Sequence, residues 1–144
     1  MAGKSVVLAF GSFDILHPGH LAYLKRAKRL GDMLIVVVSR DSSIRTIKGR
    51  EPYMDERARL EIVGSLRFVD KAVLGNRLKR EADKYAIISR YMPDVLAFGY
   101  DQKINTGELR EWLKSRGIKC RIARIRDSVS PRSFKSSRIF GRLS

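Results

Sequence analysis

The stretch that decides the fold runs from Val6 to Leu30 and reads VVLAFGSFDILHPGHLAYLKRAKRL. Its first five residues form an apolar run that is short enough for a buried strand, and residues 21–30 have a helical pattern. Between these segments lie a glycine turn at residues 11–14 and the motif HPGH at 17–20, which holds the only two histidines of the chain. This order of strand, turn, paired histidines and helix start predicts a unit that holds and activates a phosphate.

The start of the predicted helix is suited to binding an anion. A helix N-terminus presents unpaired N–H groups and a partial positive charge. Pro18 fits the first turn, where a missing N–H costs nothing, and Gly19 has no Cβ that would hold a ligand away from the backbone. His17 and His20 lie three residues apart, so both imidazoles can lie beside one ligand. Because each can donate an N–H to an oxygen that gains negative charge, we interpret the pair as catalytic rather than as surface or capping residues.

Strand-like and helix-like segments alternate along the rest of the chain, which is typical of a parallel sheet with crossover helices. The run at 34–38 is continuously apolar, as in a central strand, whereas 121–125 alternates charged and apolar residues, as at a sheet edge. The sequence predicts strands at 6–10, 34–38, 72–74, 95–98 and 121–125, helices at 21–30, 55–66, 79–91, 105–116 and 134–143, and a long basic loop at 40–54.

These elements predict a single α/β domain over residues 1–144 with a doubly wound, parallel, five-stranded, Rossmann-like sheet. Ligands of such folds bind beyond the carboxyl ends of the strands, where the strand order reverses. We expect the first and fourth strands to flank that point. The loops that follow them, 11–20 and 99–102, are the segments with the most unusual residues.

The composition is that of a globular enzyme, with 44% hydrophobic and 31% charged residues in a chain of 144. The sequence has neither an apolar run of membrane-spanning length nor the apolar core of a signal peptide, so we expect a cytoplasmic protein. Cys120 is the only cysteine, which excludes an internal disulfide and a cysteine-rich metal site.

The formal net charge of +15 raises the question of nucleic-acid binding. The basic residues are spread along the chain, and no recognised nucleic-acid reader motif is present. We therefore interpret the charge as a surface that attracts phosphorylated small molecules, with nonspecific nucleic-acid binding at low salt as a by-product.

Four stretches resemble motifs of the cytidylyltransferase-like nucleotidyltransferases, which are related in fold to class I aminoacyl-tRNA synthetases. Residues 11–14, GSFD, resemble G-T-F-D, and residues 17–20 match H-x-G-H in full. Residues 67–70, RFVD, resemble the R-Y-V-D signature of glycerol-3-phosphate cytidylyltransferase-like members. Residues 135–139, KSSRI, resemble the late I-S-T-T-K-I segment, although the Arg-Thr-Glu-Gly that precedes it in the family is missing. The resemblance covers nearly the whole chain.

Within that family, the chain looks most like the archaeal-type FAD synthases. The features that carry this resemblance are LHPGHL at 16–21 and GYDQ at 99–102, where cytidylyltransferases tend to carry Gly-Asp-Asp. The implied reaction is attack by the phosphate of FMN on the α-phosphorus of ATP, with pyrophosphate leaving. The acceptor brings its own nucleophile, so catalysis requires positioning and stabilisation of charge. Mg²⁺ or another divalent cation would be held mainly by the substrate phosphates, because the sequence has no cluster of metal ligands.

The resemblance also implies a role for each candidate residue. His20 and His17 would contact the α-phosphate in the transition state, and Lys48 would meet the triphosphate or the acceptor phosphate. The acceptor would be bound by Asp14, Lys48 and Arg67, and Asp14 would otherwise position a metal-bound water. The nucleotide would be bound by Gly11, Ser12, Phe13, His17, His20, Gly99, Tyr100, Asp101, Ser137 and Arg138.

Each of these assignments has a structural alternative. Lys48 is equally well an ordinary loop lysine, and Asp14 is equally well bonded to its own turn. Arg67 either reaches the active site or pairs with Asp70. The remaining alternatives are a plain turn at 100–101, a capped surface helix around 137–138, and a core role for Phe13, Tyr53 and Trp112 instead of a flat wall for an isoalloxazine ring.

Two rival functions stay open at this point. The first is the same chemistry with ATP or CTP and another acceptor, such as glycerol phosphate, ethanolamine phosphate or a sugar phosphate. The second is a non-catalytic, basic nucleic-acid-binding module, against which the paired histidines argue. We expect small-molecule substrates, no membrane and no specific nucleic acid as partners, and the resemblance is compatible with a homodimer.

Overall fold

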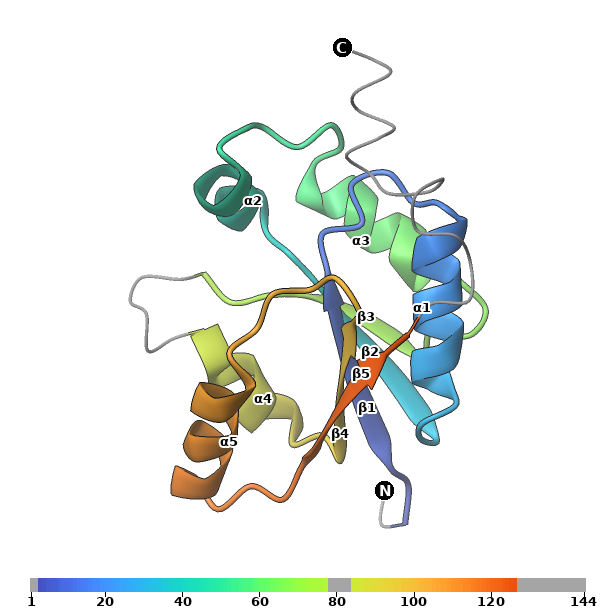
Figure 1. Cartoon of the computed structure of the whole chain (residues 1–144). Helices are drawn as coiled ribbons and strands as arrows, with labels where there is room; N and C mark the ends of the chain where they lie inside the picture. Colours follow the sequence, from blue (N-terminus) through green and yellow to red (C-terminus); the bar gives the residue numbers. More distant parts are fainter. Residues whose placement is uncertain (1–2, 78–83, 127–144) are drawn as a thin grey trace.

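The apolar runs of the sequence form one parallel sheet. A computed structural model describes residues 3–77 and 84–126 of the chain. The strands β1 (Val6–Gly11), β2 (Met33–Val38), β3 (Lys71–Leu74), β4 (Val95–Gly99) and β5 (Arg121–Ile125) pair in the order β3-β2-β1-β4-β5, as Figure 1 shows. The predicted fold class, a parallel five-stranded Rossmann-like sheet, is confirmed.

Helices cover both faces of this sheet. On one face lie α1 (Pro18–Lys28) and α3 (Glu56–Gly64), and on the other lie α4 (Ala86–Tyr91) and α5 (Thr106–Ser115) (Figure 1). The strand β1 serves both layers, because Val7 and Ala9 pack toward α1 and α3 while Leu8 packs toward α4 and α5. These three side chains are fully buried, which explains why the strand reads as a continuous apolar run.

The strand order reverses between β1 and β4, as the sequence predicted. The chain passes from β1 outward to β2 and β3 and then returns to place β4 on the other side of β1. β5 lies at the edge beyond β4, in agreement with its alternating charges. The carboxyl ends of β1 and β4 are therefore neighbours, and the loops at 11–20 and 99–102 follow them directly.

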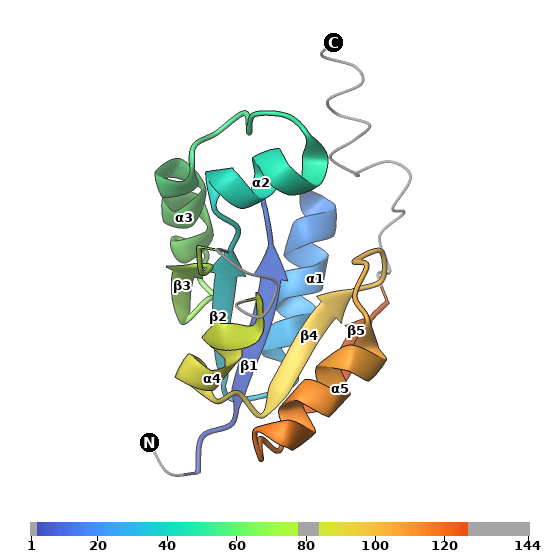
Figure 2. The ribbon, with the colours of Figure 1, turned by 90° about the vertical axis from the view of Figure 1, so that its left-hand side faces the viewer.

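One predicted loop contains a helix. Residues 40–54 were expected to be a loop, but Asp41–Lys48 form α2, which lies beyond the carboxyl ends of β1 and β2 (Figure 2). This helix is hard to predict because its eight residues bury only Ile44. Two terminal signals are nevertheless present, an acidic Asp41 in the first turn and Gly49 in the left-handed conformation (φ 68°) at the end.

Other boundaries shift or fall outside the described residues. The first helix begins at Pro18 rather than at Leu21, since His17 caps it. Of the predicted helix 79–91, the described part is α4, which ends before Met92-Pro93 as expected. Residues 79–83 and the predicted helix 134–143 lie outside the described residues. No helix in the described part of the chain is long and apolar enough to cross a membrane.

Candidate active site

The two histidines together cap the N-terminus of α1. The Nδ1 of His17 accepts a hydrogen bond from the backbone N–H of Gly19 at 3.1 Å, and the Nδ1 of His20 accepts from the N–H of His17 at 3.3 Å. The two imidazole rings stack with their centroids 3.8 Å apart. This is a capping box built from histidines, so the motif both starts the helix and fixes the rings.

The caps also fix the tautomer of each neutral ring. A nitrogen that accepts a hydrogen bond carries no proton, so the neutral rings of His17 and His20 carry theirs on Nε2. Burial, together with the nearby His17 and Lys48, lowers the pKa of His20 to about 3. A hydrogen bond with the backbone of Ile15 opposes this shift, and at neutral pH His20 is an uncharged imidazole that keeps one N–H.

A strained turn supports the ring of His20. Phe13 has a φ of 51°, in the left-handed region, and its ring is almost fully buried. This ring meets His20 edge to face, with the centroids 5.3 Å apart. Gly11 makes room for it, because a Cβ on Gly11 would lie 2.5 Å from the Phe13 ring. The glycine and phenylalanine of the GSFD turn thus shape the site through packing.

A cavity of about 680 Å³ opens in front of the histidines, beyond the carboxyl ends of the strands. Its size is in the range of small-molecule sites. The loop after β1, the N-terminus of α1, the end of β2, α2 and the loop after β4 all contribute to it. Its lining includes Gly11, Ser12, Phe13, His17, Gly19, His20, Ser39, Ser43, Ile44, Ile47, Lys48, Gly99, Tyr100, Asp101, Gln102 and Lys103.

The loop after β4 is tied back to β1. The side chain of Gln102 accepts from the backbone N–H of Gly99 at 2.6 Å and donates to the carbonyl of Phe10 at 2.9 Å. Arg124 donates to the carbonyls of Gly99 and Gln102. The side chain of Gln102 thus holds this loop in place, and Tyr100, Asp101 and Gln102 all line the cavity.

Lys48 lines the cavity on the α2 side. The Nζ of Lys48 lies 3.2 Å from the hydroxyl of Ser12. Partial burial and the neighbouring Arg50 lower the pKa of Lys48, while Asp14 opposes that change. A cation in the company of other cations favours an anionic ligand, and the phosphates of a nucleotide meet that requirement.

Asp14 has a different role from either one predicted. Its carboxylate is buried and accepts from the backbone N–H groups of Tyr53 and Met54, both at 2.9 Å, and from Arg50 at 3.2 Å. Burial raises the pKa of Asp14, but these hydrogen bonds outweigh it and the net pKa is lowered. Asp14 therefore holds the segment after α2 against the GSFD turn, instead of its own turn, and it does not line the cavity.

The structure does not bring Arg67 to the site. Arg67 is exposed and lies between α3 and β3, at the edge of the sheet where the strands begin, whereas the cavity lies where they end. Its suggested partner Asp70 instead pairs with Lys28 at 2.6 Å and accepts from the N–H of Leu34 at 2.7 Å. The RFVD stretch thus anchors α1 to the sheet, and we withdraw the acceptor-binding assignment of Arg67.

Of the remaining candidates, some line the cavity and others do not. Phe13 lines the cavity, but Tyr53 and Trp112 are absent from its described lining, and Trp112 packs against Tyr85 outside the site. Ser137 and Arg138 lie outside the described residues. Sequence reasoning missed Ser43 and Ile47, because their place at the cavity depends on α2, and it also missed Ser39, which directly follows β2.

The cavity, the histidine cap and the strand order agree with what comparison to known proteins finds. A sequence profile described as Cytidylyltransferase-like matches residues 8–142. The chain belongs to this family. The resemblance predicted from the motifs is thus confirmed for nearly the whole chain.

Members of the family that are similar to this chain include proteins named FAD synthase. The one from Aciduliprofundum boonei is 44% identical over 83% of this chain and 77% of its own length. The one from Ferroglobus placidus is 41% identical over 95% of this chain and 86% of its own length.

Solved structures extend the comparison. A crystal structure described as the lipopolysaccharide core biosynthesis protein of Thermoplasma volcanium is 43% identical, with a TM-score of 0.79 over 87% of this chain and 98% of that one. Pantoate-beta-alanine ligase of Francisella tularensis shares the fold at 16% identity, with a TM-score of 0.67 over 98% of this chain and 66% of its own.

Proposed function

We propose that this chain is an FAD synthase, which transfers the AMP group of ATP to the phosphate of FMN. The observation that carries the proposal is the stacked histidine pair at the N-terminus of α1, facing a cavity at the point where the strand order reverses. The FAD synthases that are 41–44% identical over most of this chain support FMN as the acceptor.

The chemistry requires one bond to form and one to break. A phosphate oxygen of FMN forms a bond to the α-phosphorus of ATP, and the bond from that phosphorus to the oxygen bridging toward the β-phosphate breaks. Pyrophosphate carries away the electron pair of the broken bond. His20 and His17 donate their Nε2–H groups to oxygens of the α-phosphate as negative charge builds up on them. Neither histidine has to give up a proton, because the nucleophile is already an anion.

The rest of the lining supports a division of the cavity between two substrates. Tyr100 and Asp101, from the loop after β4, would meet the base and ribose of ATP. Lys48, on α2, would meet the phosphates, including that of the acceptor. We propose the same phosphate-binding role for Ser137 and Arg138, on the strength of the family motif alone.

A divalent cation such as Mg²⁺ would neutralise the phosphates when bound. The described residues contain no group of three side chains suited to hold a metal ion. Asp14 accepts from Arg50 and two backbone N–H groups and does not line the cavity, so Asp101 is the carboxylate of the lining that fits such an ion. The substrate phosphates would then supply most of its ligands, as is common for Mg²⁺.

A second acceptor class has one observation in its favour. The similar structure from Thermoplasma volcanium is described as a lipopolysaccharide core biosynthesis protein. A sugar phosphate would use the same histidines and the same leaving group, so the catalytic residues do not separate the two acceptors.

Product analysis across nucleotides and acceptors tests the proposal. The purified protein is incubated with Mg²⁺ and either ATP or CTP, and with FMN, glycerol phosphate, ethanolamine phosphate or a sugar phosphate. We expect FAD and an equal amount of pyrophosphate from ATP with FMN. Pyrophosphate release only with a sugar phosphate would replace the proposed acceptor. If none of the acceptors led to pyrophosphate release, the proposal would be overturned.

A further inference from the structure

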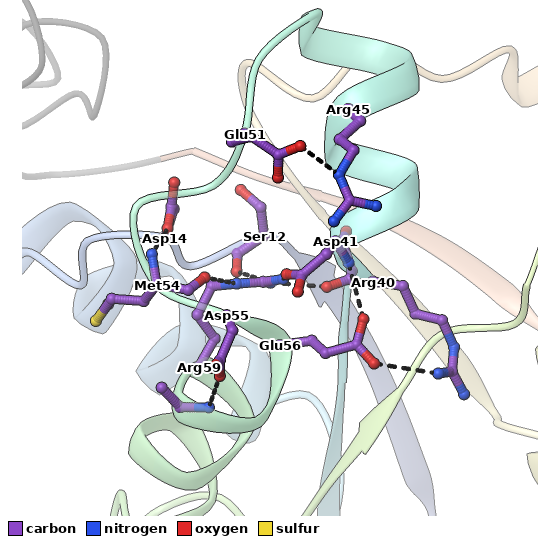
Figure 3. A network of polar contacts seen from close by, with 12 residues as sticks. Ser12, Asp14, Arg40, Asp41, Arg45, Glu51, Met54, Asp55, Glu56 and Arg59 are labelled. Atoms are coloured by element: carbon purple, nitrogen blue, oxygen red, sulfur yellow. Dashed lines mark hydrogen bonds and ion pairs between the residues drawn. The ribbon is translucent and has the colours of Figure 1, made fainter.

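Arg59 is the largest fully buried side chain of the described residues, although it carries a charge. Its guanidinium donates to the carbonyls of Met54 (2.9 Å), Ser12 (2.8 Å) and Ser39 (2.7 Å), and it pairs with the carboxylate of Asp41 at 2.7 Å (Figure 3). A buried cation is costly unless it is fully bonded, and here it is. One side chain of α3 thus joins the turn after β1, the end of β2, the first residue of α2 and the segment that enters α3.

The same network caps the start of α2. Glu56, at the start of α3, accepts from the backbone N–H of Asp41 at 3.0 Å and pairs with Arg40 at 3.3 Å (Figure 3). Both carboxylates lie at the N-terminal end of α2, where the helix dipole favours negative charge. Two acid–base pairs, Arg59–Asp41 and Glu56–Arg40, therefore hold this end of α2 against the body of the protein.

Along the rest of its length α2 is held weakly. Ile44 is its one buried residue, and the ion pair of Arg45 with Glu51 joins two largely exposed side chains. Exposed pairs of this kind contribute little. The position of α2 over the cavity therefore depends on the network at its N-terminal end.

Lys48 stands at the other end of this helix. Seven residues at 1.5 Å each place it roughly 10 Å along the helix from Asp41, so a small tilt at the start of α2 moves the Lys48 amine. The amine contacts the hydroxyl of Ser12, whose carbonyl is held by Arg59. Arg59 therefore fixes both the helix that carries Lys48 and the turn that Lys48 touches.

We propose that Arg59, acting through Asp41, is a positioning residue that sets α2 so that Lys48 meets the substrate phosphates in front of the paired histidines. The proposal rests on the proposed function for the role of Lys48, and it adds a residue that touches neither substrate. It also assigns a purpose to a fully buried cation of α3.

A double-mutant cycle tests whether the network acts through Lys48. We expect Asp41→Asn to lower kcat/KM for FAD formation by about 10-fold, and Lys48→Met by about 100-fold, on the scale of lost phosphate contacts. In the Lys48→Met background, Asp41→Asn should lower kcat/KM by less than about a further 2-fold, because the effects of coupled residues are not additive. Circular dichroism confirms that each variant is folded at the assay temperature. Equal losses in both backgrounds, or no loss in the Asp41→Asn single variant, would overturn the proposal.

A matched pair of arginine variants supplies the control. Arg59→Lys keeps the charge but cannot reproduce the four hydrogen bonds, so we expect it to behave like Asp41→Asn. Arg57→Lys makes the same change two residues away on the exposed face of α3, and its activity should equal that of the wild type. Similar losses in both variants would mean that the helix tolerates no lysine, which would contradict a role specific to Arg59.

Hydrogen exchange gives a readout that needs no activity. In Asp41→Asn, backbone amides of the peptide covering α2 should exchange faster than in the wild type, while those of β1 and β2 stay protected. Unchanged exchange in α2 would overturn the positioning role even if the enzyme were impaired. If the wild type forms no FAD, the proposed function fails, and the exchange experiment still decides whether the network holds α2.

Discussion

At the scale of single residues, His17 and His20 serve structure and chemistry together. Their Nδ1 atoms cap α1, and this leaves the proton of each neutral ring on Nε2. The same hydrogen bonds that start the helix thus set the tautomer that the proposed reaction needs. The two interpretations of these histidines, as caps and as catalytic groups, are compatible.

The lowered pKa of His20 predicts a loss of stability in acid. The unfolded side chain has a pKa of about 6.5 and the folded one a pKa of about 3, so between these values only the unfolded chain binds the proton. The free energy of unfolding should therefore fall as the pH falls from 6.5 toward 3, by up to about 1.4 kcal/mol per pH unit from this group. His20→Asn removes this contribution, because asparagine does not titrate.

Thermal unfolding between pH 7 and pH 4.5 measures this effect. The Tm of the wild type should drop more steeply than that of His20→Asn over this interval, while the two curves run parallel above pH 7. Parallel curves throughout would show that the pKa of His20 is not lowered in the folded protein.

The sequence predicts the place of some candidate residues at the cavity better than that of others, for a physical reason. His17, His20 and Tyr100 were found because their motifs directly follow β1 and β4, whose ends define the site. Asp14 and Arg67 stand in equally recognisable motifs, yet one is bonded to a segment 39 residues away and the other lies at the far edge of the sheet. A motif does not reveal which residues distant in sequence its side chains will contact.

At the scale of elements, the pairing of β1 with β4 ends at Ala9 and Ala97, so the backbone groups that follow need other hydrogen-bond partners. The hydroxyl of Tyr23, on α1, fills this gap by accepting from the N–H of Phe10 at 3.1 Å and donating to the carbonyl of Ala97 at 2.7 Å. Gln102 satisfies the carbonyl of Phe10. Burial raises the pKa of Tyr23, which keeps the hydroxyl protonated and able to donate.

Tyr23→Phe should therefore destabilise the protein by about 1–3 kcal/mol, since it leaves two buried backbone groups without this partner. Urea unfolding measures the change in the free energy of unfolding. Tyr91→Phe is the control, because Tyr91 is only half buried and its ring lies beside Lys71 and Arg90. If the free energy of unfolding fell by less than about 0.5 kcal/mol in Tyr23→Phe, or by an equal amount in the control, the role of the Tyr23 hydroxyl between β1 and β4 would be contradicted.

The helix α2 illustrates what sequence periodicity misses. Long elements with a wide apolar face are visible in the sequence, as in 21–30 and 105–116. A helix of eight residues that buries only Ile44 has too little apolar face to be predicted. Its start is fixed by Arg59 and Glu56, which lie in the next helix, so the information that specifies it is not local.

At the scale of the whole molecule, the parallel sheet could be predicted because strands buried on both faces read as continuous apolar runs. These strands pack on both faces against the two helical layers seen in Figures 1 and 2. The net charge of +15 acts over the same scale, and it should draw anionic substrates toward the cavity that holds Lys48.

Raising the salt concentration should therefore weaken substrate use. The Debye length falls from about 10 Å at 0.1 M to about 3 Å at 1 M, which screens long-range attraction but leaves contacts inside the cavity largely intact. Steady-state kinetics from 0.05 to 0.5 M NaCl should show KM for ATP and FMN rising several-fold, with a smaller change in kcat. A KM that does not depend on salt would mean that the surface charge has another purpose.

The most direct test of the central claim is the rate at which FAD forms from FMN and ATP with Mg²⁺, in the wild type and in His20→Asn. The asparagine oxygen can replace Nδ1 as the acceptor of the cap, but the variant lacks the Nε2–H to which we assign the contact with the α-phosphate. The account predicts one pyrophosphate per FAD in the wild type and a rate lower by about 10²–10³ in the variant, with an unchanged fold. A variant that forms FAD at the wild-type rate, or a wild type that forms none, would contradict it.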